Sequence, residues 1–249
     1  MLYVSENLFS PRQNVTLSAH WVVNMIRAIA FDLDDTLINT SGILAPKATL
    51  DAFKILKDNG LMLSAEDCER IRVEMIKSVS HRDVFQFLAK NHGTEETQSA
   101  LAAAVDAFYS PSLPENLPML PGALDNLKYL QPKYALYVVT AGFDVAQKDK
   151  IKSLGIKKFF KQIFVINSLA QQRKKDSFLK ILELEKLKSN ELLCIGNSLS
   201  SEIYDAVTIG AKSCYFEFGE DRGEVDENFY KKIDFHIKNH FDLIEVCGL

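Results

Sequence analysis

The stretch Ala-Ile-Ala-Phe-Asp-Leu-Asp-Asp-Thr-Leu, residues 28–37, joins an apolar run to a cluster of acidic side chains. The apolar run has the character of a buried strand, so Asp32 and Asp34 arrive together at the end of that strand. Two carboxylates and the Thr36 hydroxyl around one turn are costly unless a cation or a proton compensates the charge. The stretch therefore predicts a metal site. An acidic turn that caps the next helix is the alternative, because Asp and Thr are good N-cap residues.

The composition is that of an ordinary globular protein. The chain has 249 residues, of which 47% are hydrophobic and 25% charged, with a formal net charge of −4. This is enough to bury one large core or two modest ones. No long run of one charge sign indicates binding to nucleic acid or to an anionic membrane. The sequence also lacks an export signal and an apolar run of the ~20 residues that a membrane span needs, so we expect a soluble, cytoplasmic protein.

The four cysteines predict neither a zinc site nor a disulfide framework. Cys68, Cys194, Cys214 and Cys247 are widely spaced, with no Cys-x-x-Cys pair among them. Cys194 and Cys214 lie inside apolar, strand-like runs, where we expect them to act as small core residues.

Compact apolar runs alternate with helical patterns along much of the chain. Strands that alternate with helices imply a parallel sheet covered on both faces, with the site at the carboxyl ends of the strands. We therefore predict an α/β fold with a Rossmann-like three-layer core, in which the helix over residues 178–187 covers one face. The predicted strands are 26–31, 134–139, 162–166, 192–195 and 214–218.

One long segment interrupts this alternation. Residues 45–59, 65–80, 82–91 and 95–109 all have helical patterns, with no strand among them. Prolines at 111, 114, 118 and 121 then exclude regular helix or central strand and indicate a linker. We predict an all-helical domain at 41–114, inserted into a core made of 25–40 and 115–249. Residues 1–24 have no clear period and are interpreted as an N-terminal extension.

Three further segments end a predicted strand or begin a predicted helix. Thr140-Ala141-Gly142 follows a strand and could bind an oxyanion through its hydroxyl and backbone N–H groups. Lys174-Lys175 precedes a helix, and Asn197-Ser198 follows a strand and is followed in turn by Glu202. Each has a plain alternative as a turn, a pair of solvated charges or a helix cap. A parallel sheet would nevertheless bring all three beside the acidic pair, which favours one common site.

In these motifs the chain resembles the haloacid dehalogenase-like hydrolase superfamily, mostly phosphatases, in the branch with a helical cap inserted after the first motif. The resemblance covers about residues 25–220. The first motif, Asp32-Leu-Asp34-Asp35-Thr36, matches fully, and Thr140-Ala141-Gly142 matches the second except that Ala141 takes a place often held by Asn. The third motif is a lysine, which the spacing to Phe178 places at Lys174, with Lys175 a close rival.

The fourth motif departs from the family pattern. Family members usually carry Gly-Asp-Ser with a second Asp, whereas this chain has Gly196-Asn197-Ser198 and Glu202. Asn197 still offers an amide oxygen, and Mg²⁺ sites commonly use only one or two carboxylates together with water and phosphate. The resemblance thus implies a Mg²⁺ ion held by Asp32, Asp34, Asn197 and Glu202.

The resemblance also implies a mechanism and a substrate class. Asp32 would attack phosphorus to form an aspartyl-phosphate, and Asp34 would protonate the leaving oxygen and then deprotonate water. The substrate would be a small phosphorylated metabolite. Thr140 and Lys174 complete the implied catalytic set, and Ala141, Gly142 and Lys175 are substrate-binding candidates beside them. Arg82 is a further candidate, because it lies in the most polar interruption between the helices of the insert and could meet a second anionic group of the substrate.

Other readings stay open at this stage. A phosphomutase would use the same core residues, and a catalytically weak member that binds a phosphorylated ligand or a protein partner would explain Asn197 and Glu202. Arg82, beside Ser80 and His81, could instead belong to an exposed first helical turn behind an N-cap. The sequence makes no prediction of oligomeric state.

Overall fold

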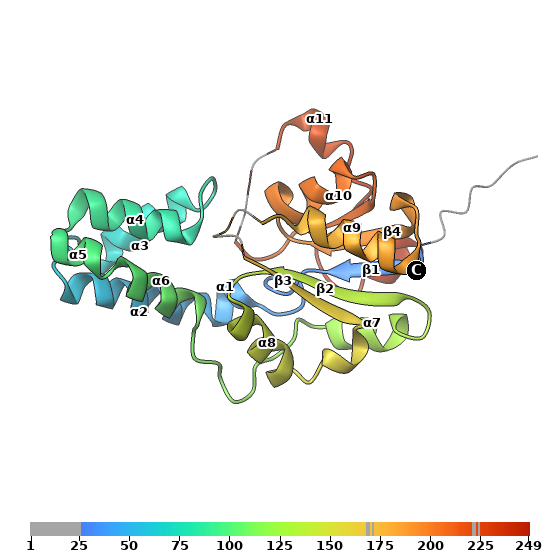
Figure 1. Cartoon of the computed structure of the whole chain (residues 1–249), viewed down its shortest axis with the longest axis horizontal. Helices are drawn as coiled ribbons and strands as arrows, with labels where there is room; N and C mark the ends of the chain where they lie inside the picture. The colour runs from blue at the N-terminus through green and yellow to red at the C-terminus, as the bar shows by residue number, and fades with distance from the viewer. Residues whose placement is uncertain (1–25, 168–169, 171, 221–222, 224) are drawn as a thin grey trace, which may run out of the picture.

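A parallel sheet lies at the centre of the computed structural model, which describes residues 26–167, 170, 172–220, 223 and 225–249. The predicted extension at 1–24 lies outside the described residues. Within them the sheet has six strands in the order β3-β2-β1-β4-β5-β6, and every pair is parallel (Figure 1). The strands are β1 Ala28–Phe31, β2 Ala135–Ala141, β3 Gln162–Ile166, β4 Leu192–Gly196, β5 Lys212–Phe216 and β6 Phe235–Ile237.

Strand β1 takes the central place because all of its residues can be buried on both faces of the sheet. Its register pairs Phe31 with Val138 of β2 on one side and with Ile195 of β4 on the other. Ile29 and Phe31 point into one hydrophobic cluster, whereas the alternating residues Ala28 and Ala30 point into another. The chain that follows β1 therefore starts between the ends of β2 and β4.

Helices cover both faces of the sheet and give the predicted three layers. Helices α7 (Ala123–Leu130), α8 (Asp144–Ser153) and α12 (Leu243–Cys247) pack on the face of Ile29 and Phe31. Helices α9 (Lys174–Glu185) and α10 (Tyr204–Thr208) pack on the opposite face, above the sheet in Figure 1. The predicted Rossmann-like α/β fold is confirmed.

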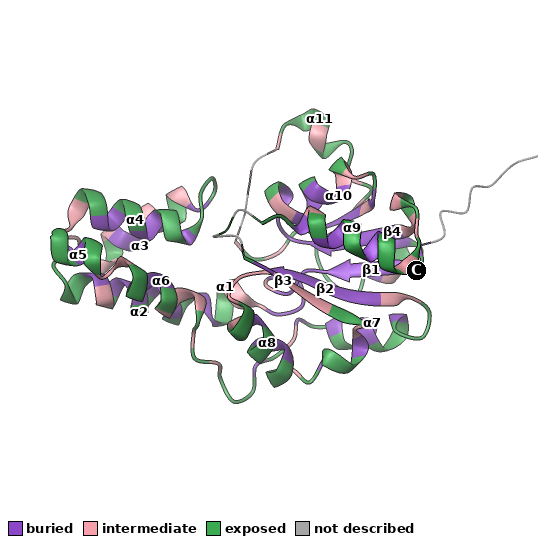
Figure 2. Cartoon of the chain, in the orientation of Figure 1, coloured by how far each residue is buried: buried purple, intermediate pink, exposed green. Residues whose placement is uncertain are grey.

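The segment that interrupts the alternation is helical, as predicted. It contains α1 (Thr40–Ile43), α2 (Ala45–Asp58), α3 (Ala65–Met75), α4 (His81–His92), α5 (Glu95–Ser99) and α6 (Leu101–Tyr109). These helices lie to the left of the sheet in Figure 1, and purple stripes in Figure 2 mark their buried faces. A hydrophobic cluster drawn from residues 52–105 fills the space between them, so this helical insert has a core of its own.

Some element boundaries differ from the sequence expectation. Helix α3 ends at Met75 because Ser80 begins the next helix, where its hydroxyl accepts a hydrogen bond from the N–H of Asp83 in a capping box. Strand β5 begins and ends two residues earlier than predicted. The three-residue strand β6 was not predicted, since a single exposed His236 between Phe235 and Ile237 is too short a pattern.

Two of the cysteines lie in the core of the sheet. Cys194 and Cys214 are fully buried in β4 and β5, as predicted.

Among the described residues, no helix is both long enough and apolar enough to cross a membrane.

Candidate active site

Asp32 is the first residue beyond β1, and the sheet still holds its backbone. Its N–H donates to the carbonyl of Ile195 at 2.9 Å, two residues before Asn197. The chain then turns sharply at Asp35, which has φ of 53°, a left-handed conformation that Asp tolerates better than most residues. The Asp35 carboxylate accepts from the N–H of Ser41 at 2.8 Å and stabilises this turn. The strand end thus fixes where the first acidic side chain lies.

Lys174 lies between two buried carboxylates. Its Nζ is 2.7 Å from Oδ1 of Asp32 and 2.7 Å from Oε2 of Glu202, and the three side chains are at most 8% exposed. The other oxygen of Glu202 accepts from the N–H of Ser198 at 2.6 Å. The first residue of α9 and the segment that follows β4 are therefore joined to the end of β1.

This cluster has less positive than negative charge. Burial raises the pKa of Asp32 to about 7, because the nearby Lys174 only partly offsets desolvation and Glu202 and Asp34 add further negative charge. Burial alone would lower the pKa of Lys174, but the two carboxylates outweigh it and hold that pKa above its ordinary value. Lys174 is therefore charged at neutral pH, and the cluster would accept a further cation.

Asp34 is surrounded by hydrogen-bond donors. Its Oδ1 accepts from Lys150 Nζ at 2.7 Å and from the Thr40 hydroxyl, and its Oδ2 accepts from Gln147 Nε2 at 2.7 Å. Burial raises the pKa of Asp34, but these donors outweigh burial and lower it below its ordinary value. Lys150 and Gln147 come from α8, and neither was among the predicted site residues.

Gln147 also binds the end of β2. Its Nε2 lies 2.6 Å from Thr140 Oγ1 and 3.1 Å from the carbonyl oxygen of Ala141. Gly142 follows with φ of +150°, and a Cβ at that position would lie 3.2 Å from the Gln147 side chain. Thr140 is thereby linked to Asp34 through one amide group.

A cavity of about 70 Å³ lies beside Asp34, between the core and the helical insert. Ala141, Gly142, Gln147 and Lys150 line it from the core. From the insert come His81, Phe108 and Tyr109, and the rings of His81 and Phe108 stack with centroids 4.2 Å apart. Carboxylate, ammonium, amide and aromatic groups therefore face one small space, as expected for a site that binds a small polar molecule.

A buried charge cluster joins the insert to the core next to this cavity. Arg72 of α3 donates to Glu220, which lies beyond β5, at 2.7 Å, and Nε2 of His81 lies 3.4 Å from the same carboxylate. Burial raises the pKa of Glu220, but His81 and Arg72 outweigh it and lower that pKa to about 2. These contacts fix the position of His81 in the cavity wall.

The polar groups near the end of β1 can be tested as ligands of a metal ion. In the part of the chain that the structure describes, no three His, Cys, Asp or Glu side chains gather closely enough to hold a metal ion. Asn197 Nδ2 donates to the carbonyl of Phe218 at 3.1 Å, so the amide oxygen of Asn197 points away from Phe218. Asp32, that amide oxygen and a backbone carbonyl are hard oxygen ligands, and they fit Mg²⁺ if water and phosphate supply the rest. Both Glu202 oxygens are engaged by Lys174 and Ser198, so Glu202 would contribute its charge rather than a direct bond.

Two predicted site residues lie away from this cluster. Arg82 is exposed on the first turn of α4 and does not line the cavity, whereas its neighbour His81 does. Lys175 is half-buried, and its backbone N–H donates to Asp205 at 3.0 Å. Of the two rival lysines, Lys174 is the one beside Asp32. The other predicted residues, Asp34, Thr140, Ala141, Gly142, Asn197 and Glu202, come to the same edge of the sheet.

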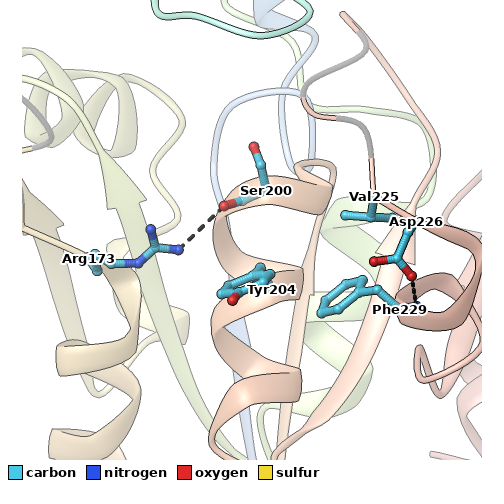
Figure 3. A pocket seen from close by; sticks show the side chains of 6 residues that line it. All are labelled: Arg173, Ser200, Tyr204, Val225, Asp226 and Phe229. Atoms are coloured by element: carbon cyan, nitrogen blue, oxygen red, sulfur yellow. Dashed lines mark hydrogen bonds between the residues drawn. The ribbon is translucent and has the colours of Figure 1, made fainter.

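A second pocket, of about 420 Å³, lies near Arg173 (Figure 3). The rings of Tyr204 and Phe229 stack with centroids 5.2 Å apart, and Asp226 accepts from the N–H of Phe229 as a helix cap. Arg173 is paired with Asp205 at 2.7 Å. This pocket contains none of the acidic residues at the end of β1, so we place the candidate active site at the strand ends.

Comparisons with known proteins agree with this fold. The family model for haloacid dehalogenase-like hydrolase matches residues 29–216. The chain is 28% identical over 225 residues to glyceraldehyde 3-phosphate phosphatase of Pyrococcus furiosus, covering 89% of this chain and 92% of that protein.

Two solved structures share the fold. A predicted phosphoglycolate phosphatase from Haemophilus somnus superposes with a TM-score of 0.68 at 20% identity, covering 88% of this chain and 97% of that chain. The HAD-hydrolase YfnB of Bacillus subtilis, described as bound to magnesium, gives a TM-score of 0.61 at 20% identity, covering 90% of this chain and 100% of that chain. The motifs, the sheet and the family match lead to one assignment. The chain belongs to the haloacid dehalogenase-like hydrolase family, among its phosphatases.

Proposed function

We propose that this enzyme is a Mg²⁺-dependent, cytoplasmic phosphatase that hydrolyses a small phosphorylated metabolite through an aspartyl-phosphate at Asp32. The observation that carries the proposal is the contact of 2.7 Å between Lys174 and Asp32 at the end of the central strand. A carboxylate would repel a phosphate dianion unless positive charge were gathered around it. Lys174 provides one such charge. Because the site has more carboxylates than ammonium groups, a bound cation would balance the remaining negative charge.

Asp32, the backbone carbonyl of Asp34 and the Asn197 amide oxygen would hold the Mg²⁺ ion, with the charge of Glu202 nearby. When bound, the ion supplies charge neutralisation of the transferring phosphoryl group. The side chains of the protein carry out the other steps. The free oxygen of Asp32 attacks phosphorus, while Lys174 holds the other oxygen in place.

Asp34 would act on the leaving group and then on water. Its carboxyl group lines the cavity. A bound phosphate dianion would raise the pKa that the donors around Asp34 lower in the free protein, so this group would carry a proton to the departing oxygen and later take one from the attacking water. Thr140 and the backbone N–H group of Ala141 would bind phosphate oxygens, whereas the N–H of Gly142 donates to the carbonyl of Ile166 at 3.0 Å.

The substrate should be small. The cavity beside Asp34 holds about 70 Å³, and His81, Phe108 and Tyr109 of the insert form part of its wall. We therefore assign the insert the role of a cap that contacts the organic half of the substrate and excludes water. Relatives that are named glyceraldehyde 3-phosphate phosphatase make glyceraldehyde 3-phosphate the first compound to test. Arg82 and Lys175 lie outside the cavity lining and have no part in this mechanism.

Phosphate release from a panel of phosphorylated metabolites tests the proposal. We expect release from three-carbon phosphates in the presence of Mg²⁺, loss of release with EDTA, and loss in Asp32→Asn. Binding of these compounds without turnover would favour a binding protein. Transfer to a second hydroxyl that exceeds hydrolysis would favour a phosphomutase.

A further inference from the structure

Two side chains on one face of α8 hold Asp34 and join it to Thr140. Gln147 and Lys150 are three residues apart in the helix, so they lie on the same face. We propose that both are positioning residues of the reaction: Lys150 aligns Asp34 with the leaving-group oxygen, and Gln147 couples Asp34 to the phosphate-binding Thr140. This inference rests on the proposed phosphatase function.

Lys150 differs from the other lysines of its helix. Its side chain is 7% exposed and its Nζ lies 2.7 Å from Oδ1 of Asp34. Lys148 is 58% exposed and pairs with Asp144 within the same helix, and Lys152 is exposed as well. A buried ion pair is often no more stable than an apolar pair of similar size. Stability therefore gives little reason for a buried ammonium group here, whereas a cavity wall that contains Asp34 gives a functional one.

Gln147 fixes the direction of the Thr140 hydroxyl. The Gln147 amide nitrogen can only donate, and it lies 2.6 Å from Thr140 Oγ1, which must therefore accept. The O–H of Thr140 is then directed to another acceptor, and a phosphate oxygen is suited to that place. The same nitrogen lies 2.7 Å from Oδ2 of Asp34, so one amide sets the group that binds phosphate and the group that meets the leaving oxygen.

The two positioning roles predict different dependence on the leaving group. A general acid has a large effect when the leaving group is a poor one and a small effect when it leaves easily as an anion. Misplacing Asp34 alone should slow only esters with poor leaving groups. Misplacing Thr140 as well should slow all esters, because every ester carries the same phosphate.

The test compares phenyl phosphate with 4-nitrophenyl phosphate, two esters that differ mainly in the leaving group. The ratio kcat/KM is measured, because it reports the steps up to departure of the leaving group. For Lys150→Met we expect about a tenfold or larger loss with phenyl phosphate and less than about a threefold loss with 4-nitrophenyl phosphate. Lys150→Arg, which keeps a cationic donor, should recover most of the phenyl phosphate activity. Lys148→Met is the matched control on the same helix and should behave like wild type.

Two further variants separate the residues. Gln147→Met should lower kcat/KM for both esters, and by a larger factor for phenyl phosphate, because Asp34 is misplaced together with Thr140. In the background of Asp34→Asn, Lys150→Met should cause no further loss with phenyl phosphate, because Lys150 acts through Asp34.

Equal losses with both esters in Lys150→Met would overturn the role of Lys150, and so would a further loss in the double variant. In Gln147→Met, a wild-type kcat/KM with 4-nitrophenyl phosphate would overturn the role of Gln147. Absence of Mg²⁺-dependent hydrolysis of either ester by wild type would instead overturn the proposed function, so the two failures are distinguishable.

Discussion

The ammonium nitrogen of Lys174 lies 2.7 Å from Oδ1 of Asp32, and the two side chains are only 3% and 8% exposed. Glu202 takes a second hydrogen bond from the same ammonium group at 2.7 Å. One lysine therefore compensates two buried carboxylates, which come from the ends of different elements. The stability and the chemistry of the site both depend on this arrangement.

Replacing Lys174 should destabilise the fold as well as abolish activity. Lys174→Met leaves Asp32 and Glu202 buried together without their counter-ion, and removal of one partner from a buried ion pair costs about 3–5 kcal/mol. We expect a loss of this size in the free energy of unfolding measured with urea at pH 7. Lys175→Met is the matched control, because that side chain is half-buried, and it should change the free energy by less than about 0.5 kcal/mol. Equal effects of the two substitutions would contradict the arrangement.

The raised pKa of Asp32 predicts a pH-dependent stability. Between its ordinary value of 3.8 and about 7 the folded state binds a proton that the unfolded state has lost, so this group lowers stability as pH rises through that range. Asp32→Asn removes the effect, and Glu202 still neutralises Lys174. The variant should therefore be more stable than metal-free wild type at pH 8, by about 1.4 kcal/mol or more, and should lose this advantage at pH 4.

Thermal unfolding of both proteins at the two pH values, without metal, measures this difference. Adding Mg²⁺ at pH 8 should raise the Tm of wild type more than that of the variant. An Asp32→Asn protein that is less stable than wild type at pH 8 would show that Asp32 stabilises the folded state.

The contact between Arg72 and Glu220 should keep the helical insert against the core. Arg72 is 9% exposed and reaches Glu220 across the two parts of the chain. Arg72→Met should destabilise the protein by about 2 kcal/mol or more, and it should raise KM more than it lowers kcat, because His81 loses a neighbour in the cavity wall. Arg70→Met, on the exposed face of the same helix, should change neither quantity. A wild-type KM in Arg72→Met would contradict a role for this contact in forming the cavity.

Gly196 provides the space that Glu202 occupies. A Cβ at position 196 would overlap the Glu202 side chain, which is buried and held by Lys174 and Ser198. Gly196→Ala should therefore lower both activity and stability, the latter by about 1–3 kcal/mol as for other overpacked sites. Gly155→Ala meets no atom within 4 Å but has φ of +63°, so it should cost stability through backbone strain and leave kcat unchanged. Full activity in Gly196→Ala would show that the place of Glu202 is not critical.

Much of the fold could be predicted because the strands and helices have strong local patterns. The apolar run that ends at Asp32 marked the central strand, and the order of strands and helices fixed a parallel sheet. Short elements such as β6 (Phe235–Ile237) could not be predicted, since their stability comes from pairing with β5 and not from their own sequence.

The candidate site was predicted where residues follow strand ends, and incompletely where they come from helices. Asp34 and Lys150 are 116 positions apart, and their contact depends on how α8 packs on the sheet. Three lysines in that helix have similar local sequence surroundings. The signal for Lys150 was its position in the helical repeat, because Gln147, Lys150 and the buried Ile151 lie on the same face of α8.

Trapping the phosphorylated enzyme tests the central claim most directly. The protein is mixed with glyceraldehyde 3-phosphate and Mg²⁺, quenched with acid during turnover and treated with borohydride, which reduces an acyl phosphate to an alcohol and leaves free carboxylates unchanged. Peptide mass spectrometry then locates the reduced residue. The proposed mechanism predicts homoserine at position 32 and none in a sample that lacked substrate. Hydrolysis of the substrate with no homoserine at position 32 would contradict the assignment of Asp32 as nucleophile.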